Sequence, residues 1–203
     1  MKNKFLIKNN IQKNYINNSI YKKNRLILQK KIKNIYKNID YKKDVFHSLS
    51  KNFKLNFKEK DLVKFKKFKK IVIIGMGGSI LGAEAIYSFL KRKINKQIFF
   101  IDNLDESRVI SVKKKINLDK TLFIIISKSG NTTETLANYI LFKNKKINSK
   151  NTIIVTEYKD NILNNYARKN NIFRIQHKNY IGGRYSALSE VGLLPAHLMG
   201  LNT

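Results

Sequence analysis

The chain has 203 residues, which suits one α/β domain of about five strands with an extra helical segment and is too short for two complete α/β domains. It contains no cysteine, which excludes disulfides and thiolate metal sites and leads us to expect a cytoplasmic protein. The formal net charge is +29, but only six of the 42 basic residues are arginine. Nucleic-acid readers rely on arginine for bidentate contacts, so this skew favours a compositional bias over a specific nucleic-acid partner.

Residues 1–69 form the first part of the chain and are predicted to be a helical amino-terminal segment. Their apolar residues recur at mixed spacings, which is compatible with one or two amphipathic helices. Lysine and asparagine interrupt the start of the chain before an apolar signal-peptide core could form. The longest apolar runs of the whole chain have strand length, so we expect no signal peptide and no membrane partner.

From residue 70 onward, strand-like and helix-like stretches alternate with a period of roughly 25 to 30 residues, as in repeated βα units. The predicted strands are 71–75, 97–102, 121–127, 151–156 and 172–176, and the predicted helices are 79–92, 105–116, 132–147, 160–169 and about 186–200. The first and third strands are continuously apolar, as expected of a parallel sheet that is covered on both faces. The prediction for residues 70–203 is therefore a doubly wound parallel five-stranded α/β domain.

Glycines cluster in three short runs, two of which directly follow strands. The first run is Gly-Met-Gly-Gly-Ser at residues 75–79, and its glycines would let a ligand oxygen approach the main chain. A dinucleotide-binding loop is an alternative, but its third glycine is replaced by Ile80, and Gly82 comes two residues late. A purely structural tight turn is the other alternative.

The second run, Ser-Lys-Ser-Gly-Asn-Thr-Thr-Glu-Thr at residues 127–135, places four hydroxyl side chains around one glycine before a predicted helix. Hydroxyls, backbone amides and the helix dipole together suit a phosphate dianion. The Walker spacing is absent, so a nucleoside triphosphate is not indicated. An ordinary Ser/Thr helix cap is the alternative.

The third run begins at Gly182 and reads Gly-Gly-Arg-Tyr-Ser-Ala-Leu-Ser-Glu-Val-Gly-Leu-Leu-Pro. With the first two runs, in this order and spacing, it resembles the glucose-6-phosphate isomerase family over about residues 70–203. The first two runs alone are similar to the wider class of sugar isomerase (SIS) phosphosugar-binding domains. Glu190 departs from the family pattern, which has a small residue or proline at that position.

The resemblance implies a role for residues of each loop. Arg184 would stabilise the charge of an enediolate transition state, because its guanidinium stays charged and donates in a planar fork. Glu134 could orient a catalytic histidine. The implied substrate-binding residues are Gly78 and Ser79 at the sugar and Ser127, Lys128, Ser129 and Thr132 at the 6-phosphate, with Lys128 acting through its main chain. The alternatives are a surface ion pair for Arg184 and helix-terminal charge complementarity for Glu134.

The implied reaction interconverts glucose 6-phosphate and fructose 6-phosphate without cofactor or metal. It needs a base near the C2 proton, which the family supplies from a second SIS domain and carboxyl-terminal helices. His47, His177 and His197 do not fall in matching motifs, and His197 is expected to pack within a helix. We therefore expect an amino-terminal portion of an isomerase that is inactive alone and forms a homodimer when complete. The other hypotheses are a non-catalytic phosphosugar-binding module of a regulator and a basic nucleic-acid binder.

Overall fold

The computed structural model describes residues 17–41 and 44–203. The strands are β1 (Lys70–Gly75), β2 (Gln97–Ile101), β3 (Thr121–Ile126), β4 (Thr152–Thr156) and β5 (Phe173–Gln176). The α-helices are α2 (Asn18–Lys37), α3 (Glu59–Leu62), α4 (Leu81–Leu90), α5 (Glu106–Lys115), α6 (Thr133–Phe142), α7 (Ile162–Lys169) and α8 (Glu190–Met199). Within this described part of the chain, no helix is long and apolar enough to cross a membrane.

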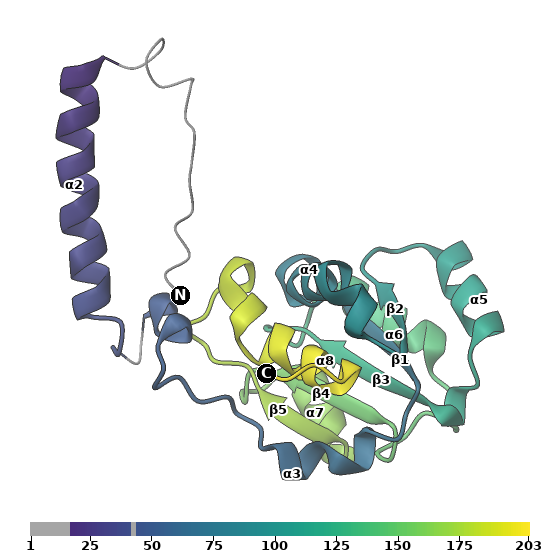
Figure 1. Ribbon diagram of the computed structural model, residues 1–203. Helices are drawn as coiled ribbons and strands as arrows, with labels where there is room; N and C mark the ends of the chain where they lie inside the picture. The colour runs from purple at the N-terminus through teal and green to yellow at the C-terminus, as the bar shows by residue number, and fades with distance from the viewer. Residues whose placement is uncertain (1–16, 42–43) are drawn as a thin grey trace.

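The five strands form one parallel sheet in the order β2-β1-β3-β4-β5 (Figure 1). The order reverses direction between β1 and β3, which lie side by side with Gly75 opposite Ile126. Ligands of such sheets bind beyond the carboxyl ends of the strands at this reversal point. The predicted doubly wound α/β fold is confirmed.

Alternate residues of the strands enter two separate hydrophobic cores. On β1, for example, Ile71 and Ile73 face one core, whereas Val72 and Ile74 face the other. Helices α3, α4 and α8 contribute to the first core, and α5, α6 and α7 to the second. Burial on both faces is the physical reason why the strands are continuously apolar rather than alternating.

The burial of the amino-terminal segment differs along its length. Helix α2 has no buried residue among those described and stands apart from the sheet (Figure 1). In contrast, Leu62, Phe65 and Phe68 are buried in the first core. The division of the chain at residue 70 stays a prediction, and residues 1–16, 42 and 43 of the predicted helical segment lie outside the described residues.

Two helix predictions need correction. The helix predicted over 132–147 ends at Phe142, and the loop that follows still buries Ile147. The helix predicted over 186–200 is a 3-10 turn at Gly183–Leu188 followed by α8. Ser189 separates the two, since its extended backbone ends the turn and its side chain accepts from Val191 N–H to cap α8.

Candidate active site

The three glycine runs meet at the carboxyl edge of the sheet. The first run follows β1 and the second follows the neighbouring strand β3. The third run, after β5, returns across the edge until Gly183 contacts Gly78 of the first run. We call the three segments the first loop (residues 75–79), the hydroxyl loop (127–132) and the arginine loop (178–190).

The first loop and the arginine loop touch through their backbones. A Cβ atom on Gly78 would lie 2.2 Å from the carbonyl carbon of Gly183, so this approach requires glycine at position 78. The Ser186 hydroxyl lies 2.9 Å from the carbonyl oxygen of Gly78 and 2.6 Å from that of Gly183. Ser79 is half-buried beside this contact. The backbone contact and the Ser186 hydroxyl together hold the arginine loop against the first loop.

Three hydroxyls of the hydroxyl loop lie close together, those of Ser127, Ser129 and Thr132. The Thr132 Oγ1 atom lies 2.9 Å from Ser127 Oγ and 3.3 Å from Ser129 Oγ. Ser127 is 1% exposed, and its Oγ also accepts from Gly130 N–H at 3.1 Å. Thr132 stands at the N-cap of α6, yet its side chain makes no capping hydrogen bond to the helix. The alternative of an ordinary Thr cap is therefore not supported.

Gly130 shapes the turn that presents these hydroxyls. Its φ is +71°, in the left-handed region that favours glycine, and an added Cβ would lie 1.8 Å from Asn161 Oδ1. Asn161 accepts from Asn164 N–H at 2.8 Å, and Asn131 accepts from Ile162 N–H at 2.9 Å. The Asn131 bond, together with the bond from Leu163 N–H to the Gly130 carbonyl oxygen at 3.1 Å, ties the hydroxyl loop to the start of α7.

Lys128 connects the hydroxyl loop to the arginine loop. Its ammonium donates to the carbonyl oxygens of Asn179 at 2.7 Å and Ile181 at 2.9 Å, and it lies 3.8 Å from a carboxylate oxygen of Glu157. The side chain is thus engaged away from the Ser127–Thr132 cluster. This arrangement is compatible with the expectation that Lys128 contributes to a phosphate site through its main chain.

Arg184 lies in the 3-10 turn of the arginine loop with its side chain exposed. No carboxylate within residues 17–41 and 44–203 pairs with it, which argues against the surface ion pair that the sequence left open. Glu134 is half-buried in the first turn of α6, and it too makes no ion pair with a described residue. Its place suits either proposed role, because the positive end of the helix dipole favours a carboxylate there.

Buried polar residues to which the sequence assigned no role lie in and beneath the arginine loop. His177, at the end of β5, is almost fully buried, and burial lowers the pKa of its imidazole, with the Lys128 charge acting in the same direction. The His177 Nδ1 atom lies 2.9 Å from the carbonyl oxygen of Lys178. Lys178 in turn pairs with the buried carboxylate of Glu190. Long-range pairing of this kind leaves no local sequence signal.

The structure also shows the surroundings of His197. His197 is buried on α8 with its ring 6.4 Å from that of Phe57, so its predicted packing within a helix is confirmed. In the described part of the chain, no three or more histidine, aspartate or glutamate side chains are grouped so that they could hold a metal ion.

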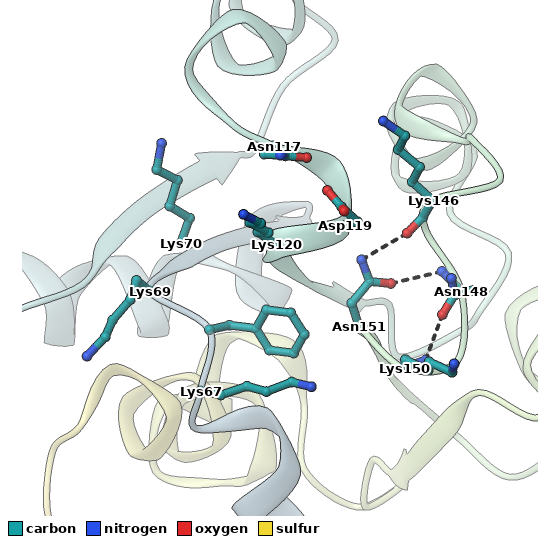
Figure 2. A pocket seen from close by; sticks show the side chains of 11 residues that line it. Lys67, Lys69, Lys70, Asn117, Asp119, Lys120, Lys146, Asn148, Lys150 and Asn151 are labelled. Carbon is teal, nitrogen blue, oxygen red and sulfur yellow. Dashed lines mark hydrogen bonds between the residues drawn. The ribbon is translucent and has the colours of Figure 1, made fainter.

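A cavity of about 640 Å³ lies at the opposite edge of the sheet, near the starts of β1, β3 and β4. Lysines dominate its lining: Lys67, Lys69, Lys70, Lys120, Lys146 and Lys150. Figure 2 shows the ammonium groups of Lys69, Lys70 and Lys146 pointing in different directions rather than toward one point. Like charges that splay into solvent do not form a built anion site, so the candidate site remains at the carboxyl edge.

The chain is a parallel α/β domain in which the first loop and the hydroxyl loop follow the two strands at the reversal point and the arginine loop folds back against the first loop. The family model described as "Phosphoglucose isomerase" matches residues 19–202, and the chain therefore belongs to the phosphoglucose isomerase family. The chain is 40% identical over 151 residues to the glucose-6-phosphate isomerase of Methanocaldococcus jannaschii, an alignment covering 71% of this chain and 37% of that protein. It is 41% identical over 145 residues to that of Borreliella afzelii, covering 64% of this chain and 26% of the relative.

A solved structure agrees with these sequence matches. The crystal structure of a glucose-6-phosphate isomerase from Chlamydia trachomatis superposes with a TM-score of 0.60 at 32% identity, covering 68% of this chain and 28% of that chain. The chain thus spans between a quarter and two fifths of the length of these relatives. The expected family is confirmed.

Proposed function

We propose that this chain supplies the phosphate-binding and arginine loops of a glucose-6-phosphate isomerase, an enzyme that interconverts glucose 6-phosphate and fructose 6-phosphate. The observation that carries the proposal is the junction of the three loops. Lys128 ties the hydroxyl loop to the arginine loop, and Gly78 ties the first loop to Gly183. These contacts join the three loops at one edge of the sheet, which supports a single ligand that touches all three.

In this proposal the hydroxyl loop binds the 6-phosphate. The hydroxyls of Ser127, Ser129 and Thr132 and the free N–H groups at the start of α6 donate to its oxygens, and the helix dipole favours the dianion. Lys128 contributes its backbone. The +29 net charge of the chain attracts the phosphorylated substrate from a distance.

The arginine loop acts at the other end of the substrate. Gly78 and Ser79 contact the sugar, and the Arg184 guanidinium stabilises the negative charge that grows on the substrate oxygens as a proton leaves C2. Donors fixed before the reaction stabilise such charge without reorganising. Glu134 orients a histidine, and the base that removes the C2 proton comes from outside these 203 residues. We further propose a homodimer in the cytoplasm for the complete protein.

Phosphate binding is testable on the chain itself. We expect fructose 6-phosphate to shift the backbone amide signals of residues 127–132 in an NMR titration of the ¹⁵N-labelled chain. Inorganic phosphate should shift the same amides, and uncharged fructose should shift none of them. Shifts confined to lysines of residues 1–70 would instead indicate nonspecific charge binding and would contradict the proposal.

A further inference from the structure

A buried ion pair closes the arginine loop. Lys178 stands at the beginning of this loop and Glu190 at its end, 12 positions later, and the Lys178 ammonium contacts Oε1 of Glu190. The Glu190 side chain is 0% exposed and the Lys178 side chain 13% exposed. The charged groups therefore meet inside the protein rather than at its surface.

Residues from the amino-terminal segment enclose this pair. The Asn56 N–H donates to Glu190 Oε1 at 2.9 Å, and the Phe53 ring lies beneath the Lys178 ammonium, 4.8 Å from ring centroid to Nζ. Asn56 Nδ2 also donates to the carbonyl oxygen of Gln176 at 3.0 Å. The pair is thus desolvated by chain that precedes the sheet, although both partners belong to the loop after β5.

Stability alone gives little reason for such a pair. Removing two charges from water costs several kcal/mol per ion, and a well-packed apolar pair of similar size is often as stable or more stable. The pair does restrict the conformation of the loop, because it joins Lys178 at one end of the loop to Glu190 Oε1 at the other end. The Glu190 carboxylate also lies in the first turn of α8, where the helix dipole favours a negative charge.

Contacts elsewhere in the arginine loop have to fix its conformation, because the Arg184 side chain makes no ion pair with a described residue that would do so. Arg184 is exposed and has no ion-pair partner in the described chain, so the contacts that hold it in place are those of its backbone. Three attachments hold that backbone. They are the Lys178–Glu190 pair, the bonds from Lys128 to the Asn179 and Ile181 carbonyls, and the bonds from Ser186 to the Gly78 and Gly183 carbonyls.

We propose that Lys178 and Glu190 are positioning residues that clasp the arginine loop and set the place of Arg184. The functional part of this inference rests on the proposed isomerase function, whereas the clasp itself concerns the chain alone. Neither residue is expected to touch substrate.

The test measures amide hydrogen exchange in the ¹⁵N-labelled chain. Ile181 N–H bonds to Lys178 O and Tyr185 N–H bonds to Gly182 O, so these two amides report on opening of the loop. We expect Glu190→Gln and Lys178→Met each to speed exchange at both amides by on the order of 10-fold or more, because each leaves one buried group unpaired. The Ser127 amide, which bonds to Val155 O, should exchange as in the original chain.

Two further variants separate positioning from general destabilisation. Lys178→Arg keeps the charge and should leave exchange within about 3-fold of the original, and the double variant Lys178→Met/Glu190→Gln should exchange more slowly than either single variant, since no charge is left unpaired. Asp102→Asn is the control. It breaks the ion pair between Arg108 and Asp102, whose charged atoms are 3.3 Å apart and which lies outside the arginine loop, and it should not affect exchange at Ile181 or Tyr185.

The inference is overturned if the single variants leave both reporter amides unchanged, or if exchange rises equally across the sheet. A variant that does not fold is replaced by its partner, because Lys178→Met and Glu190→Gln test the same bond from opposite sides. Failure of the wild-type chain to bind fructose 6-phosphate would contradict the proposed function while leaving the exchange result valid, so the two failures are distinguishable.

Discussion

Gly78 and Gly183 approach so closely that the contact tolerates a side chain on only one of them. A Cβ atom on Gly78 would lie 2.2 Å from the Gly183 carbonyl carbon, whereas a Cβ atom on Gly183 would lie 3.6 Å from Gly78 Cα, an ordinary contact distance. The junction therefore requires glycine at position 78 but has room for a Cβ atom at position 183. This asymmetry distinguishes a backbone contact that needs glycine from a glycine that is merely present.

Gly78→Ala is expected to lower the free energy of unfolding by about 1–3 kcal/mol, because backbone cannot move aside as a flexible side chain can. Gly183→Ala should cost clearly less and serves as the matched control. Urea unfolding followed by circular dichroism measures both. Equal losses in the two variants would show that the junction is not as tight as the structure indicates.

Much of the sheet was predictable because each central strand is buried on both faces. The continuous apolar runs located β1 and β3 to within one residue, and the period of the alternating elements gave the parallel arrangement. The error after α6 has a specific cause. Asn144 and Asn148 accept from the backbone N–H groups two residues later, at Lys146 and Lys150, and form turns. In an asparagine-rich chain these residues did not stand out as turn formers.

The candidate site also has a part that the sequence predicts and a part that it does not. Glycines and hydroxyls that follow strands identified the first and hydroxyl loops, because parallel strands bring their carboxyl ends to one edge. The engagement of the Lys128 ammonium with Asn179 and Ile181 and the burial of Glu190 were not predictable. Both depend on how the arginine loop folds back over the sheet, which no local pattern specifies.

Thr132→Val tests the hydroxyl cluster. The Thr132 hydroxyl does not cap α6, and Ser127 Oγ keeps its bond from Gly130 N–H, so the loss of the Thr132–Ser127 bond should lower stability by about 1 kcal/mol. It should weaken fructose 6-phosphate binding by on the order of 10-fold, since a hydrogen bond to a charged group contributes about 1.5–3 kcal/mol. Isothermal titration calorimetry measures the change. Thr133→Val, with the same substitution one residue away at an exposed position, is the control and should bind normally.

Arg184→Ala tests the proposed transition-state role in the complete protein. A donor that acts mainly on charge formed in the transition state should lower kcat on the order of 10²-fold or more while changing KM little. Arg184→Lys should recover only part of the rate, because an ammonium lacks the guanidinium fork. Steady-state kinetics provides the measurement. Near-normal kcat in folded Arg184→Ala would favour a non-catalytic phosphosugar-binding module.

The buried histidine beneath the arginine loop predicts a pH dependence of stability. Burial first, and then the Lys128 charge, lower the pKa of His177, while its bond to the Lys178 carbonyl and the charges of Glu190 and Glu157 oppose the shift. Between the lowered pKa of the folded state and the ordinary histidine pKa of about 6.5, the unfolded chain binds a proton that the folded chain does not. Stability from this group is therefore complete above about pH 6.5 and is lost as the pH falls toward the lowered pKa.

His177→Asn should remove this dependence, because asparagine can still donate to the Lys178 carbonyl but does not titrate. Urea unfolding at a series of pH values below 6.5 should give a slope that is shallower in the variant by up to about 1.4 kcal/mol per pH unit. His197, whose pKa burial also lowers, leaves a residual slope that His177→Asn/His197→Asn should reduce further. Parallel profiles for the original chain and His177→Asn would mean that the imidazole titrates alike in the folded and unfolded states, which its burial between β5 and the arginine loop does not allow.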